Sequence, residues 1–483
     1  MNTRSTPIAA TAQGAAVPGA LVLLTLAIGF VMAMIDLTAV NTALSDISIN
    51  LAVPLTGLVW VVDGYTLTFA ALLLLGGALA DRYGPKNVYQ GGLGLFLVAS
   101  VLCALAPSGD ALIAARLLQG VGAALFMPSS LGLLTHVYHD ERVRARMLGT
   151  WSAIVGGSST IGPLVGGLLV HQFGWRSVFW INVPIGLLGI VLTQMLVPAA
   201  PRHERGLSMF SHVLGVAALA SLSFVLIEGP SRGWTSVPVL LAAVCAICTV
   251  TVLVQRERSG SHPLLPHALL VTHGFGAANG LGFLINFAAF GQLFLLSLYL
   301  QQSGGADALH TGLKLLPMMA SFMVGNMLSG RISSRIGLRL PLLYGTAGGL
   351  LMAVLLLGMT PATPYLLLVA GVIVMNVSVG IAIPAMTASV MQVAGRSYAS
   401  SAAAALNANR QIGALVGVAL MGTVLHVVPS WAVRLPVAFA LVALAYAGAW
   451  TLVYRYIKLT KPASMSASAA SAGLSQVDAA GSH

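Results

Sequence analysis

The chain has 483 residues, of which 57% are hydrophobic and only 7% are charged. A soluble globular protein carries about 25% charged residues, so this composition excludes a water-exposed surface over most of the chain. The net charge of +11 does not indicate a nucleic-acid partner, because the basic residues lie in short segments between apolar runs, where they meet lipid headgroups.

The apolar runs are long enough to cross a membrane, which takes about 20 residues for about 30 Å of hydrocarbon. They predict an all-α integral membrane protein with fourteen transmembrane helices. In chain order the predicted spans are 18–42, 56–80, 87–106, 110–135, 145–170, 177–197, 210–228, 235–254, 274–300, 311–331, 341–359, 364–388, 401–426 and 433–456.

An internal repeat divides these helices into two sets. The segment 77–86 (GALADRYGPK) closes the second predicted helix, and 330–339 (GRISSRIGLR) closes the tenth with Gly, Arg and Gly in register. Parallel repeats of six helices fit a transporter built of two bundles. We therefore expect a tail at 1–17, a six-helix bundle at 18–200, two intervening helices at 201–260, a second bundle at 261–457 and a disordered tail at 458–483.

Basic residues predict the orientation of the helices. Of the 23 Lys and Arg residues, only four lie in loops on one side, and two more lie inside spans. The four are Arg176, Arg232, Lys314 and Arg434, and the two inside spans are Arg116 and Arg410. The other basic residues share the side of both chain ends. Because basic loops stay in the cytoplasm, both termini are expected there.

Four motifs resemble those of the major facilitator superfamily, and specifically its fourteen-helix drug:proton antiporters. They are the loop segment 77–86, the first-helix segment 35–44 (IDLTAVNTAL), the fourth-helix segment 112–120 (LIAARLLQG) and the glycine-rich helix-five segment 156–167. Ser45 stands where that group usually has proline. The resemblance implies two bundles that alternate access, with protons as the coupling ion and no cofactor.

The resemblance also implies a set of gating residues. In the loop motif and its repeat they are Gly77, Asp81, Arg82, Gly84, Lys86 and Arg335, and in helix five they are Gly162, Pro163 and Gly166. Family loops of this kind latch neighbouring helices at the cytoplasmic side. Ser334 replaces the acid in the second copy, so a matching latch is not expected there. Gly162 and Pro163 are expected to break or bend helix five and permit close packing.

Ionisable residues inside spans cost about 2.5–3.5 kcal/mol on insertion scales, so they are candidates for function. Counting along the helices places Asp36 and Asp63 about 25 Å above the cytoplasmic face, level with Arg116. We expect these three to meet. One aspartate would pair with Arg116, and the other would exchange a proton for the cargo. Asp36 is predicted to carry the proton and Asp63 to lie nearer the cargo; the reverse order is the alternative.

Arg410 lies near mid-membrane in the thirteenth predicted helix, with no acidic residue in the spans of its own half. A cation there would suit an anionic or carbonyl-rich cargo, whereas two aspartates would suit a cation, and the sequence leaves both open. The candidate substrate-binding residues are Asp63, Asn41, Asn286, Phe290, Asn407 and Arg410.

The predicted function is proton-coupled efflux of a small toxic or antibiotic compound across the bacterial inner membrane by a monomer. The alternative is a facilitator or importer of a small metabolite, which the Gly162-Pro163 pattern argues against. A membrane sensor or enzyme is a remote alternative. The sequence contains no HExxH metal motif, no nucleophile elbow and no P-loop, so neither an enzyme nor an ATP-driven pump is expected. No metal site is expected either.

Overall fold

A computed structural model describes residues 19–138, 140–198, 209–259, 269, 272 and 274–457. Within these ranges the elements are helices and no strand occurs. The predicted tails 1–17 and 458–483 lie outside the described residues. The helices are α1 (Gly19–Leu51), α2 (Leu55–Tyr83), α3 (Pro85–Ala104), α4 (Gly109–Val137), α5 (Glu141–Phe173), α6 (Ser177–Trp180), α7 (Asn182–Leu196), α8 (Met209–Arg232), α9 (Val237–Ser259), α11 (Phe275–Gln302), α12 (Ala308–Ile336), α13 (Arg339–Leu355), the short 3-10 turn η1 (Leu356–Gly358), α14 (Tyr365–Val427) and α15 (Trp431–Tyr456).

Local chemistry explains where several helices start and stop. The side chains of Ser108, Asp140 and Asp307 cap the first turns of α4, α5 and α12 by accepting backbone N–H groups. Gly84 has φ 92° between α2 and α3, a conformation that glycine adopts without strain. Gly395, with φ 65°, divides α14 into two arms that correspond to two predicted spans.

Twelve helical segments of the described chain are long and apolar enough to cross a membrane. Two other helices, α5 with 33 residues and α12 with 29, are equally long but more polar, and they are not among the twelve. The span predicted at 177–197 is one of the twelve, as Ser177–Leu196, and Ile181 between α6 and α7 keeps right-handed helical angles. The predicted count of fourteen spans therefore exceeds what apolar character alone supports.

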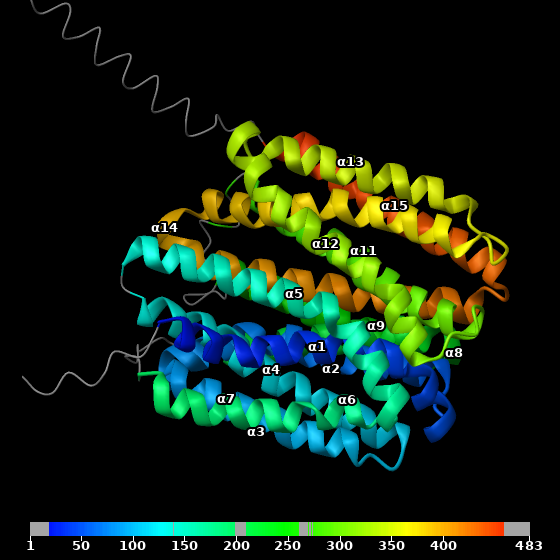
Figure 1. Ribbon diagram of the computed structural model, residues 1–483, viewed down its shortest axis with the longest axis horizontal. Helices are drawn as coiled ribbons and strands as arrows, with labels where there is room; N and C mark the ends of the chain where they lie inside the picture. Colours follow the sequence, from blue (N-terminus) through cyan, green and yellow to red (C-terminus); the bar gives the residue numbers. More distant parts are fainter. Residues whose placement is uncertain are drawn as a thin grey trace, which may run out of the picture.

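The helices lie side by side in one bundle (Figure 1). Helices α1 to α7 occupy the lower part of this view and α11 to α15 the upper part, while α5 and α12 lie against each other between them. Helix α14 also packs along α2, so the two parts meet along two seams. Helix α8 contacts both α2 and α14, whereas α9 packs mainly against α8 and leaves most of its apolar surface exposed.

Among the described residues, buried apolar side chains of the two parts share one hydrophobic core at one end of the molecule. We call this the Leu51 end, after the last residue of α1. There, residues 39–62 of α1 and α2 share one hydrophobic core with α11, α12, α14 and α15. Toward the opposite end, α1 to α5 and the end of α7 form a separate core. Among the described residues of the upper part, only Phe290 and Ala408 pack against that separate core.

Glycines allow this joining at the Leu51 end. A Cβ at Gly166 of α5 would lie 2.7 Å from the Ala39 Cα of α1. A Cβ at Gly312 of α12 would lie 2.4 Å from the carbonyl oxygen of Pro163 in α5. No side chain fits at these distances, so the backbones touch directly, as small residues permit in membrane proteins. Helix α5 continues through Pro163 as one helix, so the expected break does not occur, while the close packing does.

Candidate functional site

A fully buried ion pair lies inside the α1 to α7 part. Asp36 of α1 and Arg116 of α4 have side chains with 0% exposure, and Arg116 Nη1 lies 2.5 Å from Asp36 Oδ2. Arg116 Nε also donates to the carbonyl oxygen of Val61 in α2, at 3.0 Å. The pair therefore ties together three helices that are neighbours in the bundle.

Amide and hydroxyl groups complete the surroundings of Asp36. Gln119 Nε2 and Asn182 Nδ2 donate to Asp36 Oδ1 at 3.0 Å and 2.9 Å. Gln119 Nε2 also donates to Ser100 Oγ at 2.9 Å, and Gln119 Oε1 accepts from Arg116 Nη1 at 2.7 Å. Asp36 thus receives hydrogen bonds from α4 and α7, and the network extends to α3. Each oxygen of this buried carboxylate therefore has a hydrogen-bond donor, and the charge of Arg116 lies beside it.

Sequence reasoning assigned no role to Gln119, Asn182 or Ser100. A signal for Gln119 was present, because it stands three residues after Arg116 and hence on the same helix face. Asn182 is far from Asp36 in sequence, and the two residues meet because α7 packs on α1 and α3. The rings of Tyr65 and Phe179 also face Arg116, with its Cζ 4.6 Å and 5.8 Å from their centroids.

Asp63 does not join this cluster. Its side chain is 0% exposed, and neither carboxyl oxygen has a hydrogen-bond partner. One turn earlier on α2, Val59 lies so near Gly422 of α14 that a Cβ there would be 2.5 Å from Val59 Cγ2. Residues four apart share a helix face, so Asp63 lies on the face of α2 turned toward α14. The expected meeting of three charges is therefore a pair, Asp36 with Arg116, beside a separate acid at the seam.

Arg410 lies in the other part of the molecule, which is formed by α11 to α15, on the second arm of α14. A Cβ at Gly282 of α11 would lie 3.3 Å from Arg410 Cγ, so the side chain packs along α11. Arg410 makes no hydrogen bond or ion pair with any described residue, and its Nε is buried without a partner. The next residue back, Asn409, instead donates to Asn279 Oδ1 at 3.2 Å.

The other candidate substrate-binding residues fall at different places. Asn286 is buried and donates to its own helix at the Gly282 carbonyl oxygen, and Asn407 is half-buried. Phe290 is the residue of α11 that touches the hydrophobic cores of both parts. Asn41 lies in the joined Leu51 end, where its carbonyl oxygen accepts from Ser297 Oγ at 2.6 Å. Asn41 is thus part of the contact between the two parts.

The loop motif lies at the end opposite Leu51. Lys86 Nζ donates to the carbonyl oxygen of Gln194 in α7 at 3.2 Å. Asp81 is half-buried in the last turns of α2, and Arg82 is exposed. In the repeat, Arg335 is exposed and Ser334 donates only to the Arg331 carbonyl oxygen of its own helix.

The helix-five motif lies where the two parts meet. A Cβ at Gly162 would overlap Thr38 Oγ1 of α1, and Thr160 Oγ1 donates to the Met319 carbonyl oxygen of α12 at 3.5 Å. Together with Gly166 and Pro163, these residues bring α5 against α1 and α12. A polar, glycine-rich helix such as α5 is suited to this buried position between two apolar parts.

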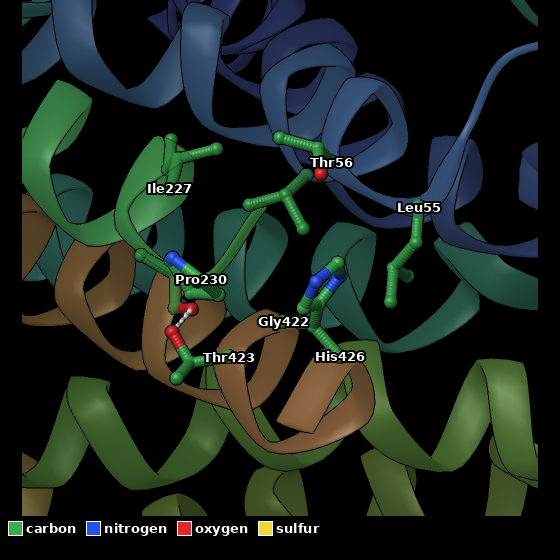
Figure 2. A pocket seen from close by; sticks show the side chains of 9 residues that line it. Leu55, Thr56, Ile227, Pro230, Gly422, Thr423 and His426 are labelled. Atoms are coloured by element: carbon green, nitrogen blue, oxygen red, sulfur yellow. Dashed lines mark hydrogen bonds between the residues drawn. The ribbon is translucent and has the colours of Figure 1, made fainter. Parts of the chain in front are cut away.

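A narrow cleft at the Leu51 end lies between α2, α8 and α14 (Figure 2). Thr56, Ile227, Pro230 and His426 are among the residues that line it. Thr423 Oγ1 of α14 donates to the Leu226 carbonyl oxygen of α8 at 3.3 Å. On the α2 side, Trp60 Nε1 donates to Glu228 Oε1 of α8 at 2.9 Å. Helix α8 therefore connects the two parts across this seam.

No metal site is formed by the residues that the structure describes, since none of their His, Cys, Asp and Glu side chains gather in groups of three. Cys103 is buried, whereas Cys245 and Cys248 are exposed on α9 as free thiols.

Asp307 precedes the first turn of α12. The backbone N–H and the side chain of His310 hold the pKa of Asp307 below its ordinary value. His171 Nδ1 of α5 lies 3.8 Å from Asp307 Oδ2, again between the two parts.

Twelve apolar spans packed around a buried ion pair are the features of a multi-pass membrane protein. The family model "Major Facilitator Superfamily" matches residues 26–418. The chain belongs to this superfamily, whose members are transporters and not enzymes.

Proteins similar to this chain include two methylenomycin A resistance proteins, from Bacillus subtilis strain 168 and Streptomyces coelicolor. Each is 47% identical to it over 91% of this chain, which is 94% of the first relative and 93% of the second. The multidrug resistance protein Stp of Mycobacterium tuberculosis is 34% identical over 84% of this chain and 75% of its own length.

Among solved structures, the crystal structure of the peptide transporter POT in complex with sulfate resembles this fold with a TM-score of 0.64. The match covers 90% of this chain and 93% of that one at 14% sequence identity. At this identity the likeness concerns the fold alone.

Proposed function

We propose that this protein exports a small toxic or antibiotic compound in exchange for protons, by alternating access between its two parts. The observation that carries the proposal is the 47% identity, over 91% of the chain, to proteins named for methylenomycin A resistance. The relatives named for multidrug resistance and for tetracenomycin C resistance and export support the same class of activity.

Asp63 is our candidate for the proton carrier, in place of Asp36. Asp36 is paired with Arg116 and accepts hydrogen bonds from Gln119 and Asn182, so a role as carrier would break a satisfied network. Asp63 is fully buried without a partner, and an unpaired carboxylate in such a place is far less costly when it is neutral. Its position at the α2 and α14 seam allows the movement of the two parts to change its access to water.

The membrane arrangement forms a further part of the proposal. We assign fourteen transmembrane helices by adding α5 and α12 to the twelve apolar spans, because each exceeds the length that crosses about 30 Å. The more polar composition of these two helices suits their position between the two parts. The division into bundles 18–200 and 261–457, with the helix pair of 201–260 between them, follows from the sequence repeat.

The basic residues orient this arrangement in the bacterial inner membrane. With both termini cytoplasmic, the Leu51 end faces outward. The structure is then closed to the outside, the state in which an exporter loads its cargo from the cytoplasm. We propose that the protein acts as a monomer, with membrane lipid, the cargo and protons as its partners.

The test is a resistance panel in a bacterium that lacks its own efflux pumps. Expression of the protein should raise resistance to at least one compound, and a protonophore should abolish the effect at unchanged protein level. Export that persists without any ion gradient would contradict the coupling, and the absence of resistance to every compound would contradict the export of drugs.

A further inference from the structure

We infer that helix α8 is a strap across the seam between α2 and α14, fixed to α2 and released from α14 when the Leu51 end opens. This inference rests on the alternating access of the proposed function and names the helices that move together. Because α9 packs mainly against α8, the pair moves with α1 to α7, and the opening runs along the surface of α14.

The hydrogen bond between α8 and α2 is the stronger of the two that α8 makes across the seam. Trp60 Nε1 of α2 donates to Glu228 Oε1 at 2.9 Å, and Arg232 Nε donates to the other carboxyl oxygen at 2.6 Å. The Glu228 side chain is only 13% exposed. Hydrogen bonds to an ionised partner are about twice as strong as neutral ones, and an indole N–H can only donate. Among the described residues Trp60 Nε1 has no second acceptor, so separation of α8 from α2 leaves this N–H without a protein partner.

The contact between α8 and α14 depends on a proline. Pro230, inside α8, has no N–H and cannot donate to the carbonyl oxygen of Leu226, four residues earlier. Thr423 Oγ1 of α14 donates to this carbonyl oxygen at 3.3 Å, and also to the Ala419 carbonyl oxygen of its own helix at 3.1 Å. When α14 moves away, Thr423 keeps the bond to Ala419, and water that enters the cleft reaches the Leu226 carbonyl. The contact with α14 is therefore the one that separates at the lower cost.

The side of α14 that faces the seam is suited to separation. Ala419, Gly422, Thr423 and His426 lie on one face of α14 and line the cleft, whose other walls belong to α2 and α8 (Figure 2). Three of these residues are small, and His426 is exposed. Helix α14 thus meets α2 and α8 with one surface of small side chains, which can part from both helices together.

Three cysteine substitutions, taken in pairs, test this assignment on the full-length protein in membranes, without its native cysteines. Thr56 of α2, Ile227 of α8 and Thr423 of α14 all line the cleft, so each pair spans one of the three helix contacts. A short bis-methanethiosulfonate reagent cross-links the pairs, and mass spectrometry of the proteolysed protein measures the rate. The background is Gly312→Ala, in which a methyl group opposes closure of the Leu51 end, or Gly330→Ala, in which nothing meets the added methyl group.

The pair of α2 and α8 should cross-link at the same rate in both backgrounds, whereas the two pairs that include Thr423→Cys should slow severalfold in Gly312→Ala. If α2 and α14 separate but the α2 and α8 pair slows, or the α8 and α14 pair does not, the inference alone is overturned. If the α2 and α14 pair keeps its rate, the two parts do not separate at this seam. That result would contradict the alternating access of the proposed function as well.

Thr423→Val removes the hydroxyl group at nearly constant shape and tests the release from α14. It should raise severalfold the labelling of a cysteine introduced at Ser45, because the closed state loses the bond to the Leu226 carbonyl oxygen. Thr451→Val is the matched control, since Thr451 Oγ1 donates within α15, to the Ala447 carbonyl oxygen at 2.8 Å. Equal labelling in the two variants would overturn the role of α8 as a strap.

Discussion

At the scale of single residues, two aspartates in one half of the molecule have opposite surroundings. Asp36 accepts from Arg116, Gln119 and Asn182, and Asp63 accepts from nothing that the structure describes. A carboxylate with three donors is a structural anchor, whereas one without donors can gain and lose a proton at lower cost to the fold. The two residues should therefore fail in different ways when they are replaced.

Asp63→Asn should abolish proton-coupled export while the protein remains folded. The amide has the shape of the neutral acid but carries no exchangeable charge, and no hydrogen bond is lost. Export assayed in inverted membrane vesicles, with thermal unfolding of the purified protein, checks both parts. Gradient-driven export at the wild-type rate would show that the proton is carried elsewhere.

Asp36→Asn should instead lower stability, by about 3–5 kcal/mol, because it leaves Arg116 buried without its counter-charge. The double substitution Asp36→Leu with Arg116→Met should recover most of this loss, since replacing both partners removes the unpaired charge. Guanidinium or thermal unfolding in detergent measures the difference. A double variant as unstable as Asp36→Asn would mean that the pair is not the cause.

At the scale of elements, α5 and α12 form the contact between the two parts. Their backbones touch at Gly312 and Pro163, and α1 meets α5 at Ala39 and Gly166. These contacts lie toward the Leu51 end, which is closed here. A side chain placed between the backbones should thus oppose closure without disturbing either bundle alone.

Gly312→Ala should shift the protein away from the state closed at the Leu51 end and lower export severalfold. Its methyl group would lie 2.4 Å from the Pro163 carbonyl oxygen. Gly330→Ala is the matched control on the same helix, because nothing lies within 4 Å of a Cβ there. Accessibility of a cysteine introduced at Ser45 to a thiol reagent reports the opening. Equal labelling in the two variants would argue against α5 and α12 as the closing contact.

The first turn of α12 carries its own prediction. Asp307→Ala should destabilise this helix by about 1 kcal/mol, because the carboxylate caps the His310 N–H. The pKa of Asp307 is lowered by that hydrogen bond, so its contribution is present above the ordinary pKa of 3.8 and is lost as pH falls through the lowered value. Thermal unfolding between pH 3 and 7 measures this, and a wild-type profile from Asp307→Ala would contradict it.

At the scale of the whole molecule, one hydrophobic core includes residues of both parts and a second core lies within α1 to α5 and Val197. Phe290 and Ala408 bridge the cores toward the end opposite Leu51, while the Leu51 end is continuous. Helix α8 bonds to both parts, through Glu228 to Trp60 and through Leu226 to Thr423. If the two parts separate at the Leu51 end, α8 has to move with one of them, and its hydrogen bond to the other part has to break.

Cysteine labelling should test the proposed orientation of the protein in the membrane. In a background without the three native cysteines, Ser303→Cys should react in intact cells with a membrane-impermeant maleimide. Ser334→Cys, in the repeat of the loop motif at the other end of α12, should react only after the cells are opened. The reverse pattern would invert the proposed topology and assign the closed end to the cytoplasm.

The apolar runs predicted most helix ends within a few residues, although α1 continues nine residues beyond its predicted end at residue 42. Length and hydropathy are local properties of a helix in lipid, so they can be read along the chain. The exceptions have physical causes. Helices α5 and α12 are more polar than the other long helices, and they pack against each other between the two parts.

Which charges meet was decided by tertiary structure alone. The sequence placed Asp36, Asp63 and Arg116 at one depth, but depth does not give the direction in which a side chain points around its helix. Packing directs Asp36 to Arg116 and Asn182, turns Asp63 toward α14, and leaves Arg410 without a partner. The rotation of each helix and the identity of its neighbours arise only when helices assemble, and they determine which acid is paired and which is not.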